Sequence, residues 1–165
     1  MAAQSVVYVI DCSGSMGAAG RLALARRELL ASLERLPETV RFQIIPYNRR
    51  AEPLRINGHS GLVPATPENK QAAAARLEAI VPEGSTEHQA ALQQALLLGA
   101  EAIYFLTDAD DLRPDQVHAL TRLNHGRTSI HAIELTAAHR DAHAMPLHVL
   151  AKENHGEYRG VDVPR

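Results

Sequence analysis

The feature that most constrains the fold is an apolar run near the amino terminus, residues 5–10, which stops at a carboxylate. The run is rich in Val, Ile and Tyr, residues that favour strands, and Asp11-x-Ser13-x-Ser15 follows it on a glycine-containing turn. A site here would lie at the carboxyl end of a strand, where open α/β sheets bind their ligands. The turn can direct one charged and two neutral oxygens at one point, which suits a hard cation such as Mg²⁺.

Apolar periodicity indicates that strands and helices alternate along the rest of the chain. Beyond residues 5–11, strands are expected at 41–47, 102–107, 129–135 and 157–161, and helices at 18–36, 67–80, 87–98, 114–123 and 145–154. Residues 51–56 are expected to form a short edge strand, because Pro53 fits an edge better than a central position, and residues 57–66 a loop. Such alternation predicts an α/β fold with a doubly wound, mostly parallel sheet and helices on both faces.

Composition narrows the class of protein. The 165 residues fit a single domain, residues 1–165, and contents of 45% apolar and 22% charged residues are typical of a globular protein. A formal net charge of −2 without a basic cluster argues against nucleic-acid binding. No stretch predicts a membrane span or a signal peptide, and the compartment stays open. Cys12, the single cysteine, permits no internal disulfide and is interpreted as a packing residue.

Three loops carry side chains with oxygen ligands, namely residues 11–15, 84–86 and 106–108. Loops that follow adjacent parallel strands open on the same edge of a doubly wound sheet, so the first and third can meet there. The second loop precedes a helix that is expected to pack nearby. Their candidate ligands are two carboxylates, Asp11 and Asp108, and three hydroxyls, Ser13, Ser15 and Thr86, which fits an exposed Mg²⁺ or Mn²⁺ site completed by water.

The order of these residues resembles the metal-ion-dependent adhesion site of a von Willebrand factor type A domain. The family pattern is Asp-x-Ser-x-Ser, then a distant Thr, then a distant Asp. It matches this chain at Asp11, Ser13, Ser15, Thr86 and Asp108. The resemblance covers essentially the whole chain and implies a Rossmann-like sheet with one short antiparallel edge strand. Ser85 and Ala109 stand where many family members have glycine.

The resemblance also implies a function. Ser13, Ser15 and Thr86 would supply neutral oxygens to Mg²⁺ or Mn²⁺, while Asp11 and Asp108 would act directly or through water. A metal with few charged ligands stays electrophilic, and in this family it takes an Asp or Glu carboxylate from a partner protein. The chain is therefore expected to be a divalent-metal-dependent protein-binding module, of the adhesion or interaction type, and not an enzyme. It is expected to work within a larger protein or complex.

The same residues also have purely structural interpretations. Asp11 at a strand end can cap the first helix, and serines such as Ser13 and Ser15 are common in turns. Thr86, with Gln89 three residues later, resembles a capping box, a role that competes with metal binding for one hydroxyl. These alternatives stay open at the level of sequence.

Two further functions compete with the binding module. One is an Mg²⁺-dependent phosphotransfer or phosphatase-type enzyme with a Rossmann-like fold, which usually needs Asp-x-Asp and a positioned lysine. Ser13 takes the place of the second aspartate, and the two lysines, Lys70 and Lys152, lie outside the strand-end loops. The other is a folded, metal-free scaffold. His139 and His143 have the spacing of a helical zinc pair but lack the metalloprotease glutamate, so they are expected to be exposed loop residues.

Overall fold

The structure, a computed structural model, describes residues 3–108, 111–136 and 146–163. One six-stranded sheet in the order β3-β2-β1-β4-β5-β6 forms its centre. The strands are β1 (Ser5–Asp11), β2 (Arg41–Tyr47), β3 (Val63–Pro64), β4 (Ala102–Thr107), β5 (Ser129–Thr136) and β6 (Tyr158–Asp162). All neighbours pair in parallel except β2 and β3, which are antiparallel. The strand order reverses between β1 and β4, and such a switch point is where open α/β sheets bind ligands.

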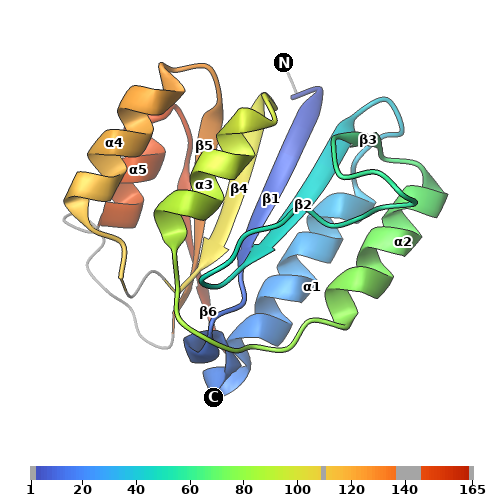
Figure 1. Cartoon of the computed structure of the whole chain (residues 1–165), viewed down its shortest axis with the longest axis horizontal. Coiled ribbons are helices and arrows are strands. Elements are labelled where there is room, and N and C mark those ends of the chain that lie inside the picture. Colours follow the sequence, from blue (N-terminus) through green and yellow to red (C-terminus); the bar gives the residue numbers. More distant parts are fainter. Residues whose placement is uncertain (1–2, 109–110, 137–145, 164–165) are drawn as a thin grey trace.

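Helices cover both faces of the sheet (Figure 1). One face carries α1 (Arg21–Glu34) and α2 (Pro67–Glu78), and the other carries α3 (His88–Leu97), α4 (Pro114–Asn124) and α5 (Pro146–Glu153). The central strand β1 supplies both cores in alternation, because Tyr8 and Ile10 pack on the first face and Val7 and Val9 on the second. A strand buried on both faces reads as a continuous apolar run, as this one does.

The predicted antiparallel edge strand exists, but its predicted position at residues 51–56 is wrong. It is β3, within the segment expected to be loop, where Val63 is buried and pairs with Phe42. Residues 51–56 form no strand and contribute only two isolated bridges, between Ala51 and Tyr47 and between Ile56 and His59. Val63 brings an apolar side chain to the core next to β2, whereas Pro53 has no N–H to offer to a ladder.

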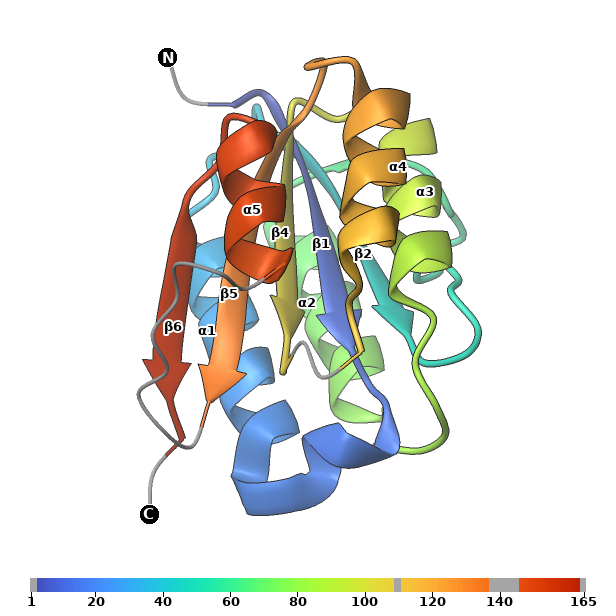
Figure 2. The same ribbon diagram turned by 90° about the vertical axis from the view of Figure 1, so that its left-hand side faces the viewer.

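The first helix begins at Arg21, later than the predicted residue 18. A 3₁₀ segment, η1 (Gly14–Gly20), precedes it, and Ala19 and Gly20 interrupt the helical path with φ angles of 54° and 72°. This segment lies beyond the carboxyl ends of β1 and β4 (Figure 2). The remaining predicted elements agree with the structure to within two residues. None of the helices among the described residues has the length and apolar character needed to cross a membrane.

Candidate functional site

Backbone pairing brings three loops together at the switch point. In the register of β1 and β4, Ile10 lies opposite Leu106, so the loops after these strands begin side by side. The segment before α3 is held against the first loop by two backbone hydrogen bonds, from Glu83 N to Cys12 O (3.0 Å) and from Gly14 N to Gly84 O (2.9 Å). The predicted convergence of the three loops is therefore present in the backbone.

Asp11 is fully buried, and both of its carboxylate oxygens are fixed. Oδ1 accepts the backbone N–H of Ser13 at 2.9 Å, and Oδ2 accepts the hydroxyl of Thr107 at 2.7 Å. Asp11 does not cap the first helix, whose N-cap residue is Gly20. Burial raises the pKa of the Asp11 carboxyl, and the nearby charge of Asp108 adds to this, while the hydrogen bonds oppose it.

Ser13 and Ser15 present their hydroxyls to each other, with the two Oγ atoms 3.1 Å apart. Ser13 is buried and Ser15 is half-buried. Ser13 stands at the N-cap position of η1, but its hydroxyl makes no capping hydrogen bond. Both hydroxyls thus lie beside the Asp11 turn without being used to end or start a helix.

Asp108 reaches the first loop through Arg21, the first residue of α1. The Nη1 atom of Arg21 lies 3.4 Å from Asp108 Oδ2 and donates to the carbonyl oxygen of Ser15 at 3.2 Å. The other carboxylate oxygen, Asp108 Oδ1, is buried and has no hydrogen-bond partner among the described residues. A buried carboxylate oxygen without a partner is costly, and it identifies a place where a ligand would be favourable.

Thr86 does not fill the capping role that its spacing to Gln89 suggests. The N-cap residue of α3 is Glu87, and the Thr86 hydroxyl donates to Asp111 Oδ2 at 3.2 Å. Asp111 is exposed and contacts Thr86 through this hydrogen bond. Ser85, which stands where many family members have glycine, does not have a positive φ, whereas Gly84 before it has a φ of 79°. Ala109 and Asp110 lie outside the described residues.

A buried imidazole lies close behind the site, and the sequence did not reveal it. His88, the first residue of α3, is 2% exposed, and its Nδ1 lies 2.6 Å from the Tyr47 hydroxyl. Burial lowers the pKa of His88, against the opposing effect of Asp11 and Asp108. Arg21 and Thr107 were also missed as site residues. For Thr107, the available clue was its place at the end of a strand, directly before Asp108.

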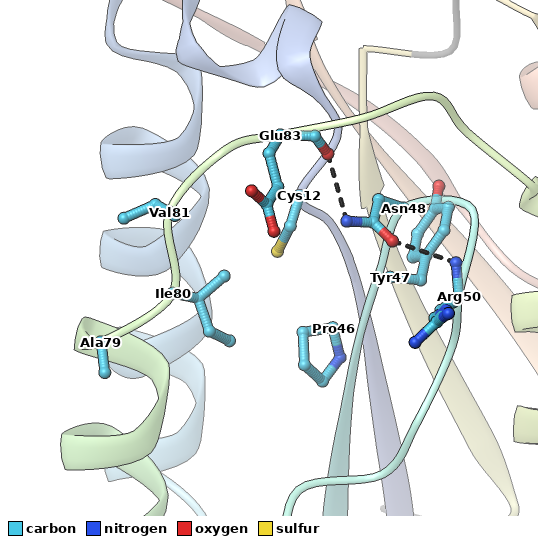
Figure 3. A pocket seen from close by; sticks show the side chains of 9 residues that line it. All are labelled: Cys12, Pro46, Tyr47, Asn48, Arg50, Ala79, Ile80, Val81 and Glu83. Atoms are coloured by element: carbon cyan, nitrogen blue, oxygen red, sulfur yellow. Dashed lines mark hydrogen bonds between the residues drawn. The ribbon is translucent and has the colours of Figure 1, made fainter.

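A hollow of about 300 Å³ lies beside the site, between the end of β2 and the segment after α2 (Figure 3). The Asn48 side chain spans one side of it, where its Nδ2 donates to Glu83 O at 3.1 Å and its Oδ1 accepts from Arg50 N at 3.0 Å. The thiol of Cys12 faces this space, but Cys12 is only 3% exposed, and burial raises its pKa to about 12. Cys12 is therefore a packing residue with little thiolate character.

Among residues 3–108, 111–136 and 146–163, no group of three or more His, Cys, Asp or Glu side chains is placed so that it could hold a metal ion by itself. His139 and His143, the pair with zinc-like spacing, lie outside these ranges. Any cation bound at the switch point would thus depend on hydroxyls as well as on two carboxylates. Such mixed oxygen sets are typical of Mg²⁺ sites that keep bound water.

Comparison with known proteins agrees with the fold. The model of the von Willebrand factor type A domain matches residues 4–160, which is nearly the whole chain. No match was found among curated proteins.

Several solved structures share the fold at low sequence identity. A von Willebrand factor type A protein from Catenulispora acidiphila is 18% identical with a TM-score of 0.79, over 96% of this chain and 38% of that one. BatB from Bacteroides thetaiotaomicron is 18% identical with a TM-score of 0.72, over 97% of this chain and 91% of that one. The PilB minor pilin from Streptococcus sanguinis is 12% identical with a TM-score of 0.66, over 96% of this chain and 56% of that one. At these identities the likeness concerns the fold.

Proposed function

The chain belongs to the von Willebrand factor type A domain family, whose members often mediate protein interactions, and we propose that it is a divalent-metal-dependent protein-binding module. The cation would be Mg²⁺ or Mn²⁺ at the switch point, in a metal-ion-dependent adhesion site. Its ligands would be Asp11, Ser13, Ser15, Thr86 and Asp108. The observation that carries the proposal is the buried Asp108 Oδ1, which has no hydrogen-bond partner in the described part of the chain, on a carboxylate that Arg21 links to the loop of the paired serine hydroxyls.

The donor set fits a small hard cation. Asp11 is held in one orientation by two hydrogen bonds, so it offers a charge that does not have to be ordered on binding. The hydroxyls of Ser13 and Ser15 add neutral oxygens that need not be deprotonated. Thr86 is held near the site by its loop, but its hydroxyl would have to exchange Asp111 for the cation. The cation would relieve the repulsion between Asp11 and Asp108, one of the causes that raise the pKa of Asp11.

A partner carboxylate would complete the coordination shell. Two carboxylates balance the two charges of the cation, but the other ligands are neutral, so the cation keeps a strong affinity for another anionic oxygen. We therefore expect the partner to be a protein that presents an Asp or Glu side chain. The site lies at the loop edge of the sheet, where a partner surface can approach it.

The enzyme alternative receives less support from the chain's own residues. Phosphoryl transfer needs cations that neutralise the phosphate oxygens. Lys70 donates instead to the carbonyl oxygens of Glu34 and Leu36, and Lys152 lies on α5. The one guanidinium described at the site, that of Arg21, is already paired with Asp108. We propose that the chain is not an enzyme, and the absence of hydrolysis of a generic phosphate ester with Mg²⁺ would agree with this.

Titration calorimetry with Mg²⁺ and Mn²⁺ tests the proposal. We expect saturable binding to the wild-type chain and loss of binding in Asp11→Ala. Asp115→Asn, which alters an exposed carboxylate on α4, is the control and should bind as the wild type does. No binding at millimolar metal, or unchanged binding after Asp11→Ala, would refute the metal site. A pull-down with and without EDTA then tests whether capture of a partner needs the metal.

A further inference from the structure

Arg21, the first residue of α1, links two of the site loops, because it pairs with Asp108 in one and donates to the Ser15 carbonyl oxygen in the other. Its guanidinium lies between the Ser15 carbonyl oxygen and the Asp108 carboxylate, with Nη1 at 3.2 Å and 3.4 Å from them. The Asp108 side chain is only 4% exposed and that of Arg21 is 23% exposed, so the pair is largely shielded from water. The Arg159–Glu28 pair, by comparison, is more exposed, at 57% and 28%.

This pair places a positive charge where the proposed cation would also need to be. Asp11 and Asp108 are two buried carboxylates close enough for the charge of one to raise the pKa of the other. In the metal-free protein the guanidinium offsets part of their repulsion. A divalent cation would do the same with twice the charge, and two cations that share one carboxylate repel each other strongly where water is excluded.

We infer that Arg21 is an internal competitor of the metal: it is the counter-ion of Asp108 in the metal-free protein and leaves when Mg²⁺ or Mn²⁺ binds. This inference rests on the proposed metal-binding function. It means that Arg21 lowers the apparent affinity for metal, since each binding event must break the ion pair. It also means that metal binding changes the surface beside the site, because a guanidinium is released there.

The surroundings of Arg21 allow this exchange. The residue opens α1, directly after the exposed residues 17–20, so its side chain has a short path to solvent. Its Nε atom is buried and has no hydrogen-bond partner among the described residues, so the departing side chain gives up no bond there. Leaving the site would allow water to hydrate that N–H group.

The experiment compares Arg21→Gln and Arg21→Lys with the wild type by titration calorimetry with Mg²⁺ and Mn²⁺, and by thermal unfolding in EDTA. Arg21→Gln should bind metal about tenfold more tightly, the factor that corresponds to ~1.4 kcal/mol. Arg21→Lys keeps the charge and should remain within a few-fold of the wild type. Arg159→Gln removes a guanidinium on β6, two strands from β4, that pairs with Glu28 and not with a site residue, and it is the matched control. In EDTA, Arg21→Gln should unfold at a lower temperature than the wild type, because Asp108 loses its counter-ion.

The outcomes separate this inference from the proposed function. Tighter binding by Arg21→Gln than by a wild type that binds metal supports competition. Equal or weaker binding by Arg21→Gln, with a wild type that binds, overturns the inference and leaves the metal site standing. Weaker binding in particular would mean that Arg21 orients Asp108 for the metal. If no variant binds metal, both the proposed function and the inference are refuted.

Discussion

Replacing Asp11 by asparagine should stabilise the metal-free protein and at the same time abolish metal binding. The Asp11 side chain is fully buried, and burial is the main cause that raises the pKa of its carboxyl. The charged form is thus less favourable in the folded chain than in the unfolded one. Asparagine keeps the shape, since its carbonyl oxygen can accept from Ser13 N and its amide can donate to the Thr107 hydroxyl.

The raised pKa of Asp11 gives the sign of the effect, because the charged carboxylate is less favourable in the folded chain. Single substitutions that stabilise a protein commonly do so by about 0.5–2 kcal/mol, and we expect Asp11→Asn to lie in the upper part of this range, about 1–2 kcal/mol. For a domain of this size the midpoint of thermal unfolding would rise by roughly 2–8 °C.

The pH dependence distinguishes an effect of the Asp11 charge from an effect of packing, because only the charge effect changes with pH. Because the folded-state pKa of Asp11 is raised above its ordinary value of 3.8, the charge penalty is present above the folded-state pKa. It disappears as the pH falls through that pKa towards 3.8, since the wild-type carboxyl is then protonated. The advantage of Asp11→Asn should therefore be largest at neutral pH and shrink in acid. His88, with its lowered pKa, makes both proteins less stable below about pH 6.5.

Urea unfolding in EDTA, at neutral pH and in mild acid, measures this difference. Asp115→Asn is the control: Asp115 is exposed, its hydrogen bond with Arg113 lowers its pKa, and its replacement should bring no gain at neutral pH. A free energy of unfolding lower than wild type for Asp11→Asn at neutral pH would refute the reasoning. So would a gain that does not change with pH.

Three further predictions concern the frame that holds the site. Gly156→Ala should destabilise the fold by about 3 kcal/mol or prevent folding in a denaturation assay, because a Cβ atom there would overlap the backbone carbonyl of Ile130. Gly61→Ala is the control and should be neutral, because a Cβ atom at Gly61 meets nothing within 4 Å. Asn154→Ala should cost about 2–4 kcal/mol on urea unfolding, because this buried amide donates to a hydroxyl and a carbonyl oxygen at 2.9 and 2.8 Å; a loss under 1 kcal/mol would contradict its role. Burial raises the pKa of the Cys12 thiol to about 12, so the thiol should resist a soluble alkylating reagent in native protein at pH 8 and react only after unfolding. Rapid labelling of the native protein would contradict this and show that the loop of residues 11–15 opens.

Much of the fold could be predicted because most of its elements carry strong local patterns. β1, β2 and β4 are apolar runs bounded by polar turns, and the structure has them at the predicted residues. α2 begins with Pro67 after Thr66, whose hydroxyl caps the helix, so the start of this helix can be predicted from neighbouring residues alone. β3 could not be found in this way, because a strand of two residues is defined by its neighbour Phe42 and not by its own sequence.

The site was predictable in its loops but not in its contacts. Asp11, Ser13 and Ser15 are close in sequence, so their mutual hydrogen bonds follow from one turn. The role of Arg21 depends on how α1 starts relative to the end of β4, a tertiary distance that no local pattern reports. Thr86 has a plausible local partner in the α3 turn but donates to Asp111 from another loop, so long-range packing decides the use of this hydroxyl.

Anomalous scattering from crystals soaked in Mn²⁺ tests the metal site most directly. We predict a single strong peak at the switch point, within coordination distance of the Ser13 and Ser15 hydroxyls and beside Asp11 and Asp108, with the Arg21 guanidinium moved away from Asp108. A fully soaked crystal without a peak between these loops, or with its peak elsewhere on the chain, would contradict the metal site and with it the proposed mode of partner binding.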